Sequence, residues 1–400
     1  MNGRRHEVYT PTREKVTLVL ILVAFCVSDY VLLWSLPHLR ISFIPSIGVP
    51  LIASFLVRIL IFLGVLAAEP LARWRSRQSM RRACRQGAKN ARSPALPSSL
   101  APPASWLFET PQHHKGKIPL SIIALLAGNL VFSAAQVNCY IIEPLAVETT
   151  HLTLAFSDLD AEAPPVRVVQ LTDLHIERFG RREAKVIQKV NALKPDLIVF
   201  TGDYINISYL DDSTSFTRFR EFIRQLSAPY GIYAVRGSVE PMPEPMARLF
   251  EGTGVRWLEQ EAVTVDVRGQ KVTLVGVACS HRQELDAMRL AETVKDIPAD
   301  AFTLLLYHSP DLIHEAVGHG MDLYLAGHTH GGQIRLPLYG AIITASAYGR
   351  RYAAGLFQES GTTMFVSRGI GFEGGNTPRA RCLCRPEIVS IDLVGQPSRQ

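Results

Sequence analysis

The sequence predicts an α/β protein in which N-terminal transmembrane helices precede a layered α/β domain. Three long apolar stretches lie within the first 140 residues, short β-branched runs alternate with amphipathic segments from residue 161, and polar residues directly follow those runs. The chain has 400 residues, of which 47% are apolar and 20% charged. It is therefore too hydrophobic for a disordered protein and long enough for two or three domains.

Charge divides the chain near residue 140. Residues 1–140 contain 16 Lys and Arg against 5 Asp and Glu, a net charge of +11, whereas residues 141–400 contain 26 against 31, a net charge of −5. A uniformly basic surface for binding nucleic acid is not expected from this distribution. We therefore predict no nucleic acid partner.

The apolar stretches cover about residues 16–36, 46–68 and 118–140, within a membrane region of residues 1–145. Each is long enough to cross a bilayer, which takes roughly 20 helical residues. Buried core helices are the alternative, but a soluble domain rarely offers three such segments with basic flanks. We predict a multi-pass membrane protein, with the lipid bilayer as a partner and a basic loop over residues 69–117.

The basic loop sets the expected orientation. It carries eight Lys and Arg residues between Arg73 and Arg92, and positively charged loops stay in the cytoplasm. After a third crossing, the C-terminal domain is expected on the non-cytoplasmic side. Two charges lie inside the spans, and the helical rise places Asp29 and Arg58 within roughly 6 Å in depth, so we predict that they pair.

The six cysteines are scattered along the chain. Their spacing predicts neither a disulfide framework nor a zinc knuckle. Cys382 and Cys384 are the only two that the sequence places close together, and we interpret them as inert thiols.

From Ala161 the pattern is that of a layered α/β domain, because short apolar runs alternate with amphipathic segments. Arg181 to Leu193 follows the first run and has apolar residues on one helical face, which predicts a βαβ unit. The predicted strands are residues 166–171, 197–200, 232–235, 272–277, 302–306 and 323–325.

Two Asp and four His residues follow the predicted strands, where sheets of this kind collect their ligands. Buried there, they are costly unless something satisfies them, and a metal cluster does so. Imidazole and carboxylate together suit first-row ions such as Mn, Fe, Co, Ni or Zn. The six residues suffice for a two-metal site and are Asp173, His175, Asp203, His308, His328 and His330.

In order, these motifs resemble the signature of the calcineurin-like metallophosphoesterase superfamily. The motifs are Asp-x-His at 173–175, Gly-Asp at 202–203, Gly-x-x-Glu at 237–240, a lone His308, and Gly-His-Thr-His at 327–330. Residues 327–337, 367–371 and 381–388 further resemble a membrane-anchored bacterial subgroup associated with UDP-2,3-diacylglucosamine hydrolysis. The resemblance covers roughly residues 160–395 and implies an αββα sandwich of two mixed sheets.

The resemblance also implies a metal-dependent phosphoric ester or phosphoanhydride hydrolase with a phosphorylated small-molecule or lipid-linked substrate. Two divalent ions are implied, Mn or another first-row metal, with a hydroxide between them attacking phosphorus. One metal would be held by Asp173, His175 and His330. The second would be held by His308 and His328, with Asp203 bridging. Asp203 and Glu240 are the residues implied to serve catalysis.

The third motif departs from the family pattern, because Ser238-Val239 stands where the family has Asn-His. A Ser hydroxyl is the weaker ligand, and Val239 cannot donate a proton. A general acid contributes about 10² to 10⁴ in rate, and phosphoanhydrides need it least because the departing phosphate requires little protonation. The alternative is a degenerate, non-catalytic relative that binds a phosphorylated ligand.

Two expectations conflict, because nucleotide-linked lipid precursors are made in the cytoplasm whereas the charge pattern places the domain outside. An exported enzyme acting on envelope phospholipids or nucleotides reconciles them. Four arginines near the motifs are interpreted either as phosphate contacts or as structural residues. His281, after the fourth predicted strand, is expected to face the cleft. The arginines are Arg236, Arg335, Arg368 and Arg381.

Overall fold

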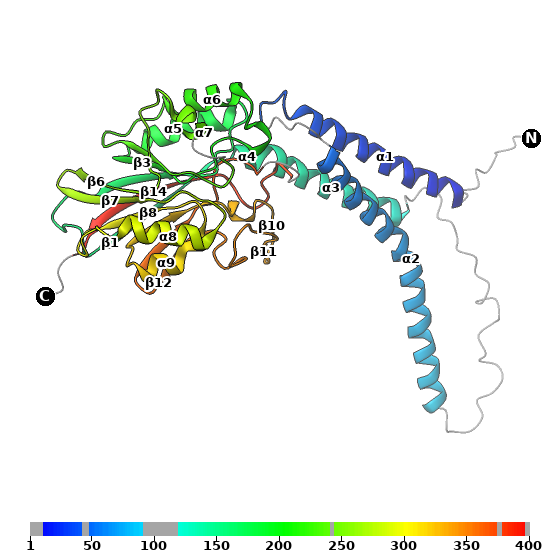
Figure 1. Ribbon diagram of the computed structural model, residues 1–400. Helices are drawn as coiled ribbons and strands as arrows, with labels where there is room; N and C mark the ends of the chain where they lie inside the picture. Colours follow the sequence, from blue (N-terminus) through cyan, green and yellow to red (C-terminus); the bar gives the residue numbers. More distant parts are fainter. Residues whose placement is uncertain (1–10, 42–47, 91–118, 241–243, 374–377, 397–400) are drawn as a thin grey trace, which may run out of the picture. The chain divides into compact units, whose positions relative to one another are not determined.

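The computed structural model describes residues 11–41, 48–90, 119–240, 244–373 and 378–396 (Figure 1). The chain forms two compact units. The first consists of Met1–Val31 with Leu51–Ala135, and the second of Leu32–Pro50 with Gln136–Gln400.

Within the described residues, three helices are long and apolar enough to cross a membrane, over Lys15–Ser35, Gly48–Ala68 and Leu120–Leu145. The helices themselves are α1 (Pro11–Ser35), α2 (Gly48–Asn90) and α3 (Leu120–Val137). Helix α2 continues well beyond its apolar part. Residues 69–90, predicted from the sequence as loop, are therefore helical, in keeping with their many strong helix formers Arg, Gln and Ala. Residues 91–118 of the predicted loop lie outside the described residues.

Asp29 and Arg58 pair, as the sequence predicts. Arg58 Nε donates to Asp29 Oδ2 at 2.6 Å, and Arg58 Nη1 donates to Asn129 Oδ1 at 2.8 Å. The guanidinium also lies 5.0 Å from the ring centroid of Phe25 and 4.9 Å from that of Phe132. Both charged side chains are buried. The pair and its polar neighbour therefore satisfy charges that would be costly alone.

Two mixed sheets build the second unit. The first has the order β1-β14-β2-β3-β4-β5, with β14 parallel to β1 and antiparallel to β2, and with β2 to β5 all parallel. Its strands are β1 (Glu148–Phe156), β14 (Glu387–Gly395), β2 (Val166–Leu171), β3 (Leu197–Phe200), β4 (Ile232–Ala234) and β5 (Arg256–Trp257). Strand β1 extends the domain upstream of its predicted start at residue 160.

The second sheet has the order β12-β13-β9-β8-β7-β6, with parallel pairing from β13 to β7 and antiparallel edges. Its strands are β12 (Gly355–Glu359), β13 (Thr362–Val366), β9 (Leu323–Ala326), β8 (Thr303–Leu306), β7 (Gln270–Gly276) and β6 (Glu261–Val267). A short hairpin, β10 (Arg335–Leu336) with β11 (Gly340–Ala341), lies outside both sheets.

Helices cover the outer faces of the two sheets (Figure 1). Apolar residues of the two inner faces, such as Val168, Val199 and Leu304, form one core between the sheets. A second core lies under α5 (Arg181–Leu193), α6 (Ser213–Ile223) and α7 (Glu244–Phe250), and a third under α8 (Gln283–Val294) and α9 (Ile313–Gly318). The predicted αββα sandwich of mixed sheets is confirmed.

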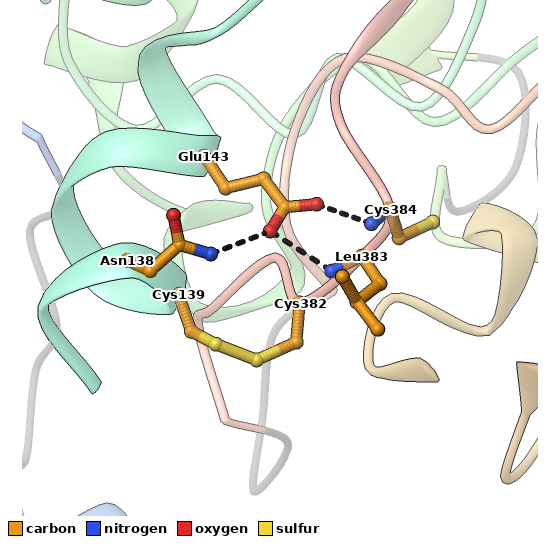
Figure 2. The surroundings of a disulfide bond; sticks show 6 residues. All are labelled: Asn138, Cys139, Glu143, Cys382, Leu383 and Cys384. Carbon is orange, nitrogen blue, oxygen red and sulfur yellow. Dashed lines mark hydrogen bonds between the residues drawn. A yellow bond between two sulfur atoms is a disulfide. The ribbon is translucent and has the colours of Figure 1, made fainter. Parts of the chain in front are cut away.

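Cys139 and Cys382 form a disulfide bond, which the sequence analysis did not predict. The interpretation of Cys382 as an inert thiol is therefore wrong, whereas Cys384 is a free, buried thiol. Cys139 lies in the short π-helix Asn138–Ile142 that follows α3. Figure 2 shows the Glu143 carboxylate beside this bond, where it accepts hydrogen bonds from the Leu383 amide at 2.8 Å and from the Cys384 amide. These contacts of Glu143 with Leu383 and Cys384 place Cys382 beside Cys139, so that the two sulfurs can bond.

Candidate metal centre

The six candidate ligands follow the carboxyl ends of four strands. Asp173 and His175 come after β2, and Asp203 comes after β3, its parallel neighbour in the first sheet. His308 comes after β8, and His328 comes after β9, its parallel neighbour in the second sheet, with His330 two residues further along. The loops at these strand ends converge, and the structure brings all six side chains together.

The first cluster consists of Asp173, His175 and His330, whose ligand atoms lie within 4.8 Å of one another. His175 Nε2 and His330 Nε2 face each other at 3.1 Å. His330 Nε2 lies 3.5 Å from Asp173 Oδ1. All three residues are buried.

The second cluster consists of Asp203, His308 and His328 and meets the same 4.8 Å limit. His308 Nε2 lies 3.1 Å from Asp203 Oδ2 and 3.1 Å from His328 Nδ1. Asp203 Oδ2 is also 3.6 Å from His175 Nε2. Asp203 therefore lies between the two clusters.

Five of the six residues have a left-handed backbone, with φ between 42° and 69°. This conformation is uncommon outside glycine, and in a folded protein it concentrates at functional sites. We attribute the convergence of these side chains on one site to the sharp turns that this backbone conformation makes. The residues are Asp173, His175, Asp203, His328 and His330.

Main-chain groups fix the orientation of the second cluster. The amides of Ser238 and Val239 donate to Asp203 Oδ1 at 2.7 and 3.0 Å. His308 Nδ1 lies 2.7 Å from the Thr201 carbonyl, which accepts only from a protonated nitrogen, so Nε2 is left for the cluster. A Cβ at Gly237 would lie 2.2 Å from Asp203 Oδ1, so only glycine fits there.

Burial and charge set the protonation of the centre. Burial lowers the pKa of His175, and burial together with the neighbouring His308 lowers the pKa of His328 to about 4. Burial also disfavours the charged form of His308, but Asp203 outweighs it and holds the pKa of His308 well above its usual value. Burial likewise opposes the charged form of Asp203, yet the neighbouring His308 holds the pKa of Asp203 well below the usual range. Asp203 and His308 therefore each favour the charged form of the other.

Glu240 faces main-chain amides. Its carboxylate accepts hydrogen bonds from the amides of Tyr204 at 2.6 Å, Gly237 at 2.9 Å and Asp203 at 3.2 Å. Burial and the charge of Asp203 raise its pKa to about 7. The side chain is thus placed to hold the loops after β3 and β4 together.

The third motif, at residues 237–240, departs from the family pattern and lies beside the second cluster. Ser238 Oγ is 3.1 Å from Asp203 Oδ2 and 3.5 Å from His328 Nδ1. His281 is exposed, bonds to the Ser238 carbonyl through Nε2 at 2.8 Å, and has its ring centroid 6.4 Å from that of His328. As expected from the sequence, His281 therefore borders the site.

Sequence reasoning missed Glu373, which forms a third candidate metal-binding group with His175 and Asp203. Its Oε2 lies 3.6 Å from His330 Nε2. Glu373 follows β13 in a segment just beyond Ser367–Gly371, whose resemblance to the subgroup was the available signal.

Each of the four arginines considered from the sequence takes part in a hydrogen bond, and that of Arg335 runs from its amide to the Cys382 carbonyl. Arg381 is buried and donates to the carbonyls of Gly371 and Arg368, with Nη2 3.4 Å from His330 Nδ1. Arg368 pairs with Glu148 and Glu387. Arg236 is buried, and its carbonyl accepts from the Cys279 amide. Arg381 and Arg368 therefore have structural contacts, which favours the structural alternative for them.

The fold and this site define an α/β protein with two adjacent clusters of Asp and His side chains at strand ends that could hold metal ions. A family model described as calcineurin-like phosphoesterase matches residues 166–332. The uncharacterized metallophosphoesterase YkuE of Bacillus subtilis (strain 168) is 32% identical over 283 residues, covering 68% of this chain and 93% of that protein. The chain therefore belongs to the calcineurin-like metallophosphoesterase family, whose members use a dinuclear metal site.

Two further relatives have more specific names. Phosphodiesterase YaeI of Escherichia coli (strain K12) is 30% identical over 261 residues, covering 63% of this chain and 90% of that protein. UDP-2,3-diacylglucosamine pyrophosphatase LpxG of Chlamydia muridarum (strain MoPn / Nigg) is 24% identical over 323 residues, covering 64% of this chain and 92% of that protein.

Proposed function

We propose that this protein is a membrane-anchored, dinuclear metal-dependent hydrolase that cleaves a phosphoanhydride or phosphodiester bond of a lipid-linked nucleotide. One observation carries the proposal. Six buried or half-buried Asp and His side chains converge from four strand ends into two adjacent clusters, and five of them accept a strained backbone to do so.

The donor set fits two divalent transition metals. Four imidazoles and two carboxylates suit Mn, Fe, Co, Ni or Zn, because Mg and Ca prefer oxygen ligands. We assign Asp173, His175 and His330 to one ion, His308 and His328 to the other, and Asp203 to both. When bound, the two ions supply an activated water and stabilise charge on the phosphoryl oxygens.

The residues of the chain then have separate tasks. The Ser238 and Val239 amides hold the Asp203 carboxylate between the clusters, and the Thr201 carbonyl keeps Nε2 of His308 available. Glu240 fixes the loops that carry Asp203 and Gly237, so we propose a positioning role for it in place of direct catalysis.

The missing Asn-His pair favours an anhydride substrate. Val239 offers no proton to a leaving group, and this matters least when the leaving group is a phosphate ester of low pKa. LpxG, one of the relatives, is named for pyrophosphatase activity on UDP-2,3-diacylglucosamine. A nucleotide-diphospho-lipid of this kind is the substrate class that we propose.

Three features support a membrane-anchored domain of residues 160–395 on the non-cytoplasmic side. Three helices are apolar enough to span a bilayer, within a membrane region of residues 1–145. The basic residues 73–92 lie between the second and third of them, as in cytoplasmic segments. The Cys139–Cys382 disulfide is typical of an oxidising compartment.

The test uses the full-length protein in detergent, because a fragment starting at residue 150 would lose Cys139. Bound metal per chain is measured, and Mn-dependent hydrolysis of UDP-2,3-diacylglucosamine is compared with that of an alkyl phosphate monoester. We expect two metals per chain and a preference for the anhydride. Asp203→Asn serves as the inactive variant, and His151→Ala, on an exposed position of β1, as the matched control. No turnover of either substrate with both metals bound would refute the proposal.

A second candidate is a non-catalytic relative that binds a phosphorylated ligand, and Ser238-Val239 is the observation that favours it. The double variant Ser238→Asn with Val239→His restores the family pattern. If the wild type has one metal or none and no turnover, and the double variant gains both, the chain is a binding protein derived from an enzyme.

A further inference from the structure

The hairpin beside the metal centre exposes apolar side chains to solvent. We call residues 335–345, which comprise β10, β11 and the chain up to Ala345, the apolar hairpin. Leu338 at its tip is fully exposed, and Ile343 is 77% exposed. Contiguous exposed apolar surface on a folded domain marks a contact with a partner or a membrane. The remaining exposed apolar residues are Leu336, Tyr339 and Ile342.

The same apolar surface continues into a cavity that reaches the metal centre. A cavity of about 270 Å³ is lined by Ile342 and Ile343 of the hairpin and by His328 and His330 of the two clusters. Ile334 lies in its wall at the base of the hairpin. A ligand in this cavity would therefore have an apolar part on the hairpin and a polar part at the candidate metals.

The base of the hairpin is fixed to the carboxyl end of the third candidate membrane span. That span is Leu120–Leu145, and its last residues belong to the same compact unit as the metal centre. Cys139 of the span is bonded to Cys382, whose carbonyl accepts from the Arg335 amide at 2.9 Å. Glu143 of the span holds the amide of Leu383, next to Cys382 (Figure 2). The first residue of the hairpin, Arg335, is thus tied through Cys382 to the carboxyl end of this candidate span.

An aromatic side chain of the hairpin, Tyr339, contacts a basic side chain just beyond it, Arg350, and the two together suit a lipid headgroup layer. The Arg350 guanidinium lies 4.0 Å from the Tyr339 ring centroid and donates to the Tyr339 carbonyl at 2.9 Å. Arg350 is exposed. Tyr with Arg at the edge of an apolar surface is typical of segments that lie at a membrane interface, where the cation meets anionic headgroups.

We propose that the apolar hairpin inserts into the interfacial layer of the lipid bilayer and guides an acyl chain of a membrane lipid into the cavity at its base, with the phosphate of that lipid at the metal centre. The acyl-chain part of this inference rests on the proposed function. On this proposal the substrate is a lipid that is still embedded in the bilayer. Apolar contact between its acyl chain and the hairpin then contributes to substrate specificity.

Fluorescence quenching tests the insertion. The full-length protein is placed in nanodiscs of phosphatidylglycerol and phosphatidylcholine, with or without brominated acyl chains, as Leu338→Trp, Met288→Trp and wild type. Met288 is the control because it is 70% exposed on α8 and belongs neither to the apolar hairpin nor to the residues that line the cavity. We expect brominated lipid to quench the fluorescence added by Leu338→Trp and to leave that added by Met288→Trp unchanged. Equal quenching of both, or of neither, overturns the proposal, and a shielded but unquenched Trp at 338 would assign the hairpin to a protein partner.

Kinetics test the acyl-chain route. Hydrolysis of CDP-diacylglycerol in nanodiscs is compared with that of soluble bis(4-nitrophenyl) phosphate for the wild type, for Leu338→Ser with Ile343→Ser, and for Met288→Ser. We expect the ratio of lipid to soluble rate to fall roughly tenfold or more in the hairpin variant only, since burying a Leu or Ile side chain favours binding by that much. An unchanged ratio overturns the route. If neither substrate is hydrolysed by any variant, the proposed function fails, and the quenching result alone still decides whether the hairpin contacts lipid.

Discussion

Arg58 and Asp29 form a buried ion pair between two helices that are long enough to span a membrane, with Arg58 Nε 2.6 Å from Asp29 Oδ2. Removing one partner leaves the other charge buried and unpaired. That cost is about 3–5 kcal/mol, more than most single interactions contribute.

We predict that Asp29→Ala lowers the amount of folded protein in the membrane, because Arg58 loses its counter-charge. The double variant Asp29→Ala with Arg58→Leu is expected to recover most of it. Ser28→Ala, on the neighbouring exposed residue, is the control. Yield is measured by size-exclusion chromatography of detergent extracts, and additive losses in the double variant would contradict a direct pair.

The disulfide gives a second prediction. When the protein is denatured without reductant and alkylated, Cys279 and Cys384 should react, whereas Cys139 and Cys382 should react only after reduction. Replacing both bonded cysteines with Ala should lower the free energy of unfolding by about 2–5 kcal/mol, because the bond closes a long loop. Peptide mass spectrometry checks the first statement and denaturant unfolding the second. Alkylation of Cys382 before reduction would disprove the bond.

Metal addition should raise the melting temperature, since the six candidate ligands converge only in the folded chain. A metal concentration of about 100 times its Kd stabilises the fold by about 2.7 kcal/mol. His308→Ala should lose most of this shift, whereas the exposed His151→Ala should keep it.

The rise in melting temperature that metal addition causes should become smaller as the pH falls. Binding requires neutral imidazoles, and Asp203 holds the pKa of His308 well above its usual value, so protons compete with the metal for His308 already near neutral pH. His328, with a pKa of about 4, takes up a proton only in stronger acid. Differential scanning fluorimetry between pH 5 and 8, with and without EDTA, measures the effect. A shift that is independent of pH would argue against histidine ligands.

Glu240→Gln should destabilise the fold more than an ordinary surface change. The carboxylate accepts from three amides, and a carboxamide presents an NH₂ group to at least one of them, leaving a buried donor unpaired at a cost of about 1–3 kcal/mol. We expect lower stability together with weaker metal binding, since the loop carrying Asp203 loosens. A variant with normal stability and metal content but no turnover would show instead that Glu240 acts in the chemistry itself.

Much of the centre was predictable because it depends on local pattern. Asp173, Asp203 and His308 each follow a short apolar run, and parallel strands bring such positions to one edge. The helix Arg181–Leu193 was predicted with its observed bounds from its apolar face alone.

Other features depend on contacts between distant segments, which no local pattern encodes. Cys139 and Cys382 are 243 residues apart and meet only because Glu143 and the end of the candidate span hold the tail. Glu373 lies on an irregular loop some way beyond the end of β13, so its position relative to a strand end did not mark it as a neighbour of His330. The helical extension of α2 departs from the predicted loop because its Arg, Gln and Ala residues favour a helix, whereas the pattern of charge predicts only the side of the membrane.

Strand β14 follows the other described strands in the sequence, yet it lies between β1 and β2 in the first sheet. Neither neighbour can complete its hydrogen bonding until residues 387–395 have been synthesised. The sheet, and with it the loops that carry Asp173 and Asp203, therefore closes only after those residues have left the ribosome. Until then the polypeptide can still be threaded through a translocation channel, and a stop codon before Glu387 should give a product that degradation removes.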